Sequence, residues 1–155
     1  MDLKPGDKAP KFRLATDGGN EVSLAALKGQ PFVLYFYPKD DTSGCTKEAI
    51  GFSESRKKFD ALGVAVIGVS KDSAASHDKF KAKYKLKIVL ASDPETETAL
   101  AYGVWVQKSM YGRKYMGMER TTFLVDAKGV IREIWHKVKV PGHVDAVLAA
   151  AKKLQ

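Results

Sequence analysis

The stretch FVLYFYPKDDTSGCTKEAI, residues 32–50, joins a predicted strand to a predicted helix. Its first six residues form an apolar run of the kind that fills a buried strand in a parallel or mixed sheet. A turn rich in Pro, Asp, Ser and Gly follows, and the segment that begins near Thr46 has helical periodicity. The only cysteine of the chain, Cys45, therefore lies at the predicted start of a helix that follows a strand and a turn.

This position favours a negatively charged sulfur. Unpaired backbone N–H groups and the positive end of the helix dipole point towards the first turn. An ordinary thiol is less than about a tenth ionised near neutral pH, and an almost complete thiolate needs about 3.4 kcal/mol of preference for the anion. The dipole supplies roughly 0.3–2 kcal/mol, so a neighbouring hydroxyl and a cation have to supply the remainder. The alternative is that Cys45 is a small buried apolar residue without a chemical role.

The rest of the chain alternates between strand and helix patterns, which predicts an α/β fold with a mixed sheet. In chain order, we expect a hairpin over 12–24, a strand at 31–38, a helix over 44–62, a strand at 64–69, a helix from Asp72 or Ser73 to about Tyr84, a strand at 88–91, a short helix over 95–102, an irregular loop over 105–119, a second hairpin with strands at 121–126 and 130–138, and a final helix after Pro141 and Gly142. No repeat or linker divides the chain, so we predict one domain over residues 1–155.

Composition bounds the class of protein. Hydrophobic residues make up 45% and charged residues 28% of the chain, as in soluble globular proteins. No apolar run approaches the roughly 20 residues of a membrane span, and the N-terminal segment lacks the apolar core of a signal peptide. A single cysteine excludes a disulfide within the chain. A cytoplasmic protein without a membrane partner is the expectation.

A formal net charge of +8 raises the possibility of nucleic-acid binding. The basic residues are spread along the chain, with a concentration of alternate lysines between Lys79 and Lys87. Phe80 and Tyr84 are spaced as one face of a helix, so these lysines are interpreted as solvated side chains near a helix C-terminus. We predict no nucleic-acid partner. A steep salt dependence of DNA binding is the property that would contradict this prediction.

The turn before Cys45 resembles a known motif. Pro38–Cys45 is similar to the P-x-x-x-T/S-x-x-C box of the peroxiredoxins, and YFYPKDDTSGCTKEA resembles the bacterioferritin-comigratory, or Q-type, branch. The similarity continues in the segments GDKAPKF (6–12), GVS (68–70), SDP (92–94), YGV (102–104) and RTTFLVD (120–126). The resemblance implies a thioredoxin-like fold, with a central mixed sheet flanked by helices and an N-terminal β-hairpin extension. It also implies a thiol-dependent peroxidase that acts on hydrogen peroxide and organic hydroperoxides.

The same resemblance implies the roles of five residues. Cys45 attacks the peroxide, Thr42 orients it, and Arg120 lies against the sulfur and stabilises the transition state. Pro38 shields the sulfur, and Glu48 orients Arg120. Each supporting residue also has a simpler interpretation: Thr42 as a helix cap, Glu48 as a complement to the helix dipole, Arg120 as a surface residue and Pro38 as the end of a strand.

One departure from the family pattern bears on the mechanism. Many Q-type members carry a second, resolving cysteine five positions after the first, where this chain has Ile50. Others carry it in the helix after the second strand, where this chain offers Phe80, Lys81 and Tyr84. The chain therefore predicts a one-cysteine cycle, in which thioredoxin, glutaredoxin, glutathione or another external thiol reduces the sulfenic acid.

Other chemistries find little support in the sequence. His77, His136 and His143 are isolated and no cysteine pair accompanies them, so we expect no metal site. No phosphate-binding or dinucleotide glycine motif indicates a cofactor. The second hypothesis is a non-catalytic thioredoxin-like redox sensor or binding module that forms mixed disulfides. For the oligomeric state, a monomer or a weak homodimer is expected.

Overall fold

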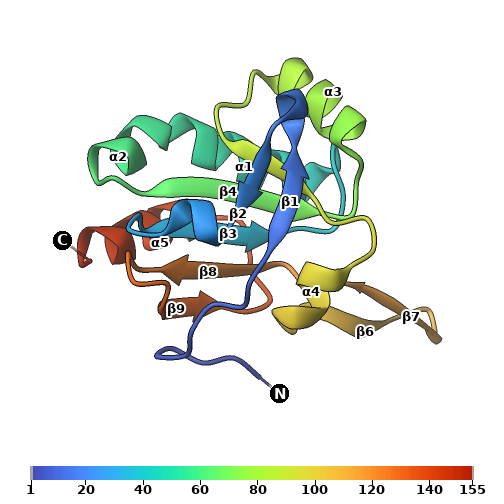
Figure 1. Ribbon diagram of the computed structural model, residues 1–155. Coiled ribbons are helices and arrows are strands. Elements are labelled where there is room, and N and C mark those ends of the chain that lie inside the picture. The colour runs from blue at the N-terminus through green and yellow to red at the C-terminus, as the bar shows by residue number, and fades with distance from the viewer. Residues whose placement is uncertain (1, 155) are drawn as a thin grey trace.

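The computed structural model describes residues 2–154. A seven-stranded sheet with the order β2-β1-β5-β4-β3-β8-β9 forms its centre (Figure 1). Its strands are β1 (Arg13–Thr16), β2 (Glu21–Ser23), β3 (Phe32–Phe36), β4 (Ala65–Ser70), β5 (Val89–Ser92), β8 (Thr121–Val125) and β9 (Ile131–Trp135). The helices are α1 (Ser43–Glu54), α2 (Arg56–Ala61), α3 (Ala74–Tyr84), α4 (Glu97–Ala101) and α5 (His143–Lys152), with short 3-10 turns η1 (Asp17–Gly19) and η2 (Ala25–Leu27). The predicted mixed α/β architecture is confirmed.

The strand directions in the middle of the sheet determine which segments lie at the same edge of the sheet. β3 runs parallel to β4, and β4 runs parallel to β5. β8 runs antiparallel to β3, with Thr121 opposite Phe36. Because the first residue of β8 faces the last residue of β3, the residue before β8 and the loop after β3 meet at the same edge of the sheet. The residue before β8 is Arg120, and the loop after β3 leads into α1, whose first turn carries Cys45.

The sheet separates two apolar cores. β3 is buried along its whole length, and its side chains alternate between the two faces. On one face, Val33 and Tyr35 pack with residues of α1, α2, α3 and α5, among them Phe52, Phe59, Phe80 and Val147. On the other face, Phe32, Leu34 and Phe36 pack with residues of the N-terminal segment and α4 (Figure 1). Cys45 belongs to the first core, so the first turn of α1 is anchored on packed aromatic side chains.

The predicted N-terminal hairpin is confirmed, and it extends the sheet. β1 pairs antiparallel with β2 and, on its other side, with β5. The second predicted hairpin, β8–β9, is also confirmed, but β9 ends at Trp135 and not at residue 138. Lys137 has a φ of 47°, which is incompatible with a continuing strand.

The prediction of an irregular loop over 105–119 is wrong. β6 (Trp105–Met110) and β7 (Arg113–Met118) form an antiparallel pair outside the main sheet (Figure 1). Tyr111 and Gly112 form the connection, with φ angles of 52° and 78°, and a two-residue turn of type I′ requires positive φ at both positions. Both strands are largely exposed, so burial on one face imposes no apolar alternation that the sequence could display.

The predicted helix over 44–62 is also corrected, because it consists of two helices. Ser55, with φ −94° and ψ 2°, leaves the helical region between α1 and α2. The predicted end is confirmed, since Gly63 follows with a φ of 71°. Ser73 caps α3 as expected by accepting a hydrogen bond from the Ser76 N–H at 3.1 Å.

Candidate active site

Cys45 is the third residue of α1 and is 1% exposed. The loop that leads to it turns sharply at Asp41, which has a φ of 58°, a conformation that Asp tolerates better than most residues. Thr42 then has an extended backbone and precedes the first helical residue. The sulfur is thus held at the N-terminal end of a 12-residue helix, where the first N–H groups have no acceptor within the helix.

Arg120, the residue before β8, contacts Cys45. Its Nη2 donates a hydrogen bond to Cys45 Sγ at 3.3 Å, and its Nη1 donates to Glu48 Oε1 at 2.7 Å. The Val138 N–H donates to the Arg120 carbonyl at 2.9 Å and fixes the backbone from the other side. Gly44 provides the space for the guanidinium, because a Cβ at this position would lie 3.1 Å from Nη2. Three of the predicted site residues, Cys45, Glu48 and Arg120, are therefore brought into direct contact.

The charges of this group are strongly coupled. Glu48 is completely buried, and burial raises its pKa to about 7 even though Arg120 acts in the opposite direction. Burial alone would lower the pKa of Arg120, but the charges of Glu48 and Cys45 hold it above its ordinary value. Among the described residues, Glu48 Oε2 has no hydrogen-bond partner. One guanidinium thus serves both the sulfur and the buried carboxyl group.

Replacing Glu48 by glutamine should remove a pH dependence of stability. The folded protein binds the Glu48 proton more tightly than the unfolded chain does, because the pKa rises from 4.5 to about 7. The contribution of Glu48 is therefore fully present below pH 4.5 and is lost as the pH rises through 7, by on the order of 3 kcal/mol. Urea unfolding at pH 5 and pH 8 should show this loss in the wild type and a smaller one in Glu48→Gln. Equal pH slopes for the two proteins would contradict the assignment.

Thr42 does not cap the helix through its side chain. Its hydroxyl donates to the Lys39 carbonyl at 2.9 Å, and no side-chain cap bond is formed at the start of α1. Because a hydroxyl has one hydrogen, Thr42 Oγ1 is left with lone pairs that can accept a hydrogen bond from a ligand. Pro38 lies in the bend after β3 and is exposed, and its shielding of the sulfur stays a prediction.

The structure adds two residues to this neighbourhood that the sequence did not indicate. Lys108 of β6 donates to the Met118 carbonyl, and its pKa is lowered by burial and by Arg120, while Glu119 and Cys45 act in the opposite direction. His143 Nε2 forms a hydrogen bond with Thr122 Oγ1 at 2.8 Å. Burial, together with the charge of Arg120, lowers the pKa of His143 to about 4. Both lie far from residues 38–48 in the chain, and no local motif marks them.

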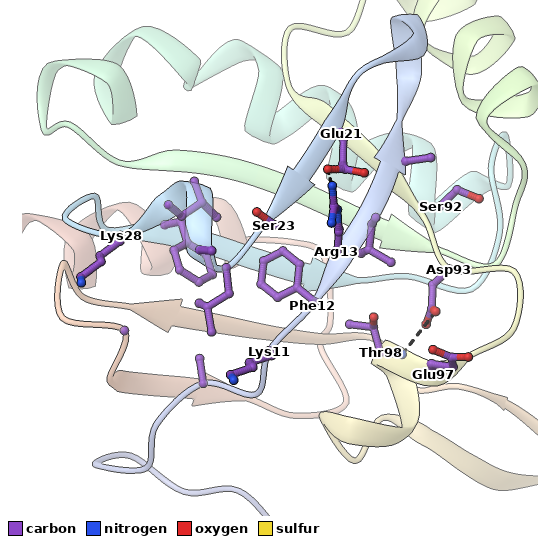
Figure 2. Close-up of a pocket in the computed structure, with 18 of the residues that line it drawn as sticks. Lys11, Phe12, Arg13, Glu21, Ser23, Lys28, Ser92, Asp93, Glu97 and Thr98 are labelled. Carbon is purple, nitrogen blue, oxygen red and sulfur yellow. Dashed lines mark hydrogen bonds and ion pairs between the residues drawn. The ribbon is translucent and has the colours of Figure 1, made fainter.

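A large hollow in the described structure lies away from these residues. It is an open groove of about 1610 Å³ beside the N-terminal hairpin, with Phe12 at its floor and Lys11, Lys28 and Glu97 at its margins (Figure 2). None of Cys45, Thr42 and Arg120 lines it. The groove holds no cysteine, so the nucleophile and not the size of the hollow identifies the candidate site.

Other types of site are absent from residues 2–154. No group of three or more His, Cys, Asp or Glu side chains could hold a metal ion there. His77 forms hydrogen bonds with Asp40 and Ala91, His136 with Glu119, and His143 with Thr122. Within residues 2–154, none of the three histidines is a hydrogen-bond partner of the Cys45 sulfur. In the same part of the chain, none of the helices has the length and apolar character needed to cross a membrane.

Comparison with known proteins identifies the family. The family model described as AhpC/TSA matches residues 5–134. The chain belongs to the AhpC/TSA family. Its curated relatives include a putative peroxiredoxin of Coxiella burnetii, 52% identical over 96% of this chain and 98% of the relative. They also include peroxiredoxin Bcp of Bacillus subtilis, 46% identical over 99% of this chain and 98% of the relative.

A solved structure shows the same fold. The bacterioferritin comigratory protein of Xanthomonas campestris, described for its alkyl peroxide reduction activity, superposes with a TM-score of 0.88 at 44% identity over 92% of this chain and 90% of that chain. The AhpC/TSA chain is thus a peroxiredoxin of the bacterioferritin-comigratory type with a thioredoxin-like fold, and it is a thiol-dependent peroxidase. The resemblance carried by residues 35–49 is confirmed.

Proposed function

We propose that this peroxidase works by a one-cysteine cycle centred on Cys45. The observation that carries the proposal is the 3.3 Å contact between Cys45 Sγ and a guanidinium that is itself held by Glu48. The Cys45 thiolate attacks one peroxide oxygen, the O–O bond breaks, and the second oxygen leaves as hydroxide or alkoxide, which takes up a proton. Sulfur is oxidised to sulfenic acid and the peroxide is reduced to water or an alcohol.

Each neighbouring group has a separate task in this step. Arg120 stabilises the thiolate and the charge that develops as the O–O bond lengthens, since a donor fixed in a site of low polarity is worth more than one in water. Thr42 Oγ1 accepts a hydrogen bond from the peroxide O–H, because its own hydrogen is already given to Lys39. Glu48 is a positioning residue that holds Arg120, and Pro38 covers the approach to the sulfur.

We assign hydrogen peroxide and organic hydroperoxides as substrates. The alkyl peroxide reduction activity described for the Xanthomonas campestris relative supports the second class. No resident cofactor enters this cycle.

An external thiol completes the cycle. The chain has no second cysteine, and Ile50 occupies a position that often carries one in this branch. The external thiol attacks the sulfenic sulfur and releases water, and a second thiol then cleaves the mixed disulfide and restores Cys45. Glutathione with glutaredoxin, thioredoxin and other small thiols are the candidate reductants. A cytoplasmic location, a single domain and a monomer or weak homodimer stay predictions.

A reductant panel tests this cycle. Peroxide consumption is measured with dithiothreitol, with glutathione plus glutaredoxin, and with thioredoxin plus its reductase. We expect many turnovers with at least one system, and mass spectrometry of the oxidised enzyme should show a Cys45 sulfenic acid that a dimedone-type probe traps. A single stoichiometric oxidation without turnover under all three systems would favour the redox-sensor hypothesis instead.

A further inference from the structure

The loop between β3 and Cys45 is tied to helix α3 by a buried polar cluster that the proposed mechanism does not use. Asp40, whose side chain is 4% exposed, lies 2.7 Å from Nδ1 of the fully buried His77. Tyr37 donates to Asp40 Oδ1 at 2.6 Å, and the Ser76 hydroxyl donates to Oδ2 at 2.8 Å. The Asp40 N–H donates to Asp72 at 2.8 Å, so both side chain and backbone of this residue are fixed.

The contacts of His77 define its charge. Nδ1 faces the Asp40 carboxylate, and Nε2 faces the Ala91 carbonyl in β5 at 2.9 Å. A carbonyl oxygen only accepts hydrogen bonds, and an ionised carboxylate does the same, so both ring nitrogens donate and the ring is an imidazolium. Burial alone would lower the pKa of His77, but Asp40, the Ala91 carbonyl and the charge of Asp72 hold it above its ordinary value. Burial would raise the pKa of Asp40, and its bonds to His77, Tyr37 and Ser76 hold it below its usual value.

A second tie to α3 is weaker. Asp41 accepts hydrogen bonds from Lys83 at 2.6 Å and from Tyr84 at 2.5 Å, but Lys83 and Asp41 are both well exposed. Exposed ion pairs contribute little, whereas a buried pair whose hydrogen-bonding groups are satisfied holds its members in one geometry. The position of the loop is therefore controlled mainly at Asp40.

One step connects Asp40 to the peroxide. The residue before it, Lys39, supplies the carbonyl that receives the Thr42 hydroxyl hydrogen. Where that carbonyl lies determines where the lone pairs of Thr42 point. We propose that the buried Asp40–His77 ion pair is a positioning device of the peroxidase reaction, which fixes the Lys39 carbonyl and thereby aims the Thr42 hydroxyl at the peroxide. This role rests on the proposed function of Cys45 and Thr42.

The test separates peroxide chemistry from general reactivity of the sulfur. His77→Gln keeps a polar side chain but carries no charge, and its single amide nitrogen cannot replace the two ring nitrogens that face Asp40 and Ala91. In single turnovers of the reduced protein, its rate constant with hydrogen peroxide should fall about tenfold or more, the size of a lost charged hydrogen bond. Alkylation of Cys45 by iodoacetamide does not use Thr42, and its rate should change by less than about twofold.

A double-mutant cycle with Thr42→Val gives the second readout. If His77 acts through Thr42, adding His77→Gln to Thr42→Val should have little further effect: the double variant should react with peroxide less than about twofold more slowly than Thr42→Val alone. Ser76→Ala removes one donor to Asp40 from a half-buried position and carries the same test if His77→Gln does not fold; we expect a loss of roughly threefold. Asp78→Ala is the matched control, because Asp78 also lies in α3 and accepts a 2.8 Å hydrogen bond from the Gly18 N–H but does not contact Asp40. Its rate constant with hydrogen peroxide should equal that of the wild type.

Two results would overturn the role of the ion pair while leaving the proposed function intact. One is a set of independent effects, in which the losses of His77→Gln and Thr42→Val multiply in the double variant. The other is a parallel fall in the peroxide and alkylation rates, which would mean that the cluster supports the fold of the site as a whole. A wild-type protein whose Cys45 does not react with peroxide would instead refute the proposed function, and the positioning role with it.

Discussion

Replacing Cys45 by serine is expected to abolish peroxide consumption. A serine hydroxyl at this position is not ionised at neutral pH, and its oxygen lacks the nucleophilicity of a thiolate. Removing the nucleophile should lower the rate by at least roughly 10⁴-fold, the scale seen when an enzyme loses its attacking group. The measurement is peroxide consumption in the presence of the best reductant from the panel. Because Arg120 Nη2 can donate to the serine oxygen, the variant should retain its fold and its thermal unfolding should change little.

Two comparisons make this experiment decisive. Ser43→Ala, two residues earlier and exposed, should consume peroxide at the wild-type rate. Cys45→Ala should be as inactive as Cys45→Ser, because neither contains a thiol. A Cys45→Ser protein that still turns over peroxide at the wild-type rate would mean that the reaction does not pass through sulfur in this chain.

The second large effect is expected for Arg120. Arg120→Met removes the charged donor to the sulfur, and the loss of one fixed donor of this kind lowers a rate by about 10²–10³-fold. The rate of hydrogen peroxide consumption with the best reductant from the panel measures this loss. Arg120→Lys should have an intermediate rate, because an ammonium group cannot bridge the sulfur and Glu48 as the planar guanidinium does.

Stability and chemistry can be separated at this position. Arg120→Met leaves Glu48 buried without its partner, and breaking a buried ion pair costs about 3–5 kcal/mol. Combining Arg120→Met with Glu48→Gln should recover much of the lost free energy of unfolding, but it should not restore the rate of peroxide consumption. Arg132→Met in β9, which removes the ion pair of the exposed Arg132 with Asp126, is the control and should affect neither the stability nor the rate. A double variant that regains activity would show that Arg120 acts only by holding the fold.

The central part of this molecule could be predicted from local patterns. The run 32–37 is apolar because β3 is covered on both faces, and such a strand is easily recognised in a sequence. The motif that ends at Cys45 places the nucleophile, and Arg120 follows from the family resemblance. In contrast, β6 and β7 contact little of the core, so nothing in their sequence marks them as strands. The break at Ser55 is one residue long and is equally unmarked.

The family resemblance implied the long-range contacts of Arg120 with Cys45 and Glu48, whereas the contacts of Asp40 with α3 could not be predicted. Asp40 and His77 are 37 residues apart, and Glu48 and Arg120 are 72 residues apart. Charged and polar residues of these types occur throughout the chain, and only the folded arrangement selects partners among them. The sequence therefore indicated the nucleophile, the family and, through the resemblance, Arg120 and Glu48 as its neighbours, whereas the partners of Asp40 required the tertiary structure.

The pairing of β3 with β8 also constrains how the length of this chain can change. Thr121 lies opposite Phe36, and Arg120 precedes it by one residue. Inserting one residue between Arg120 and the paired part of β8 would turn the guanidinium to the opposite face of the sheet, because side chains alternate along a strand. The turn between β8 and β9 can lengthen without moving Arg120. Natural insertions and deletions in this part of related chains should accordingly gather at residues 126–130 and be rare between 119 and 122.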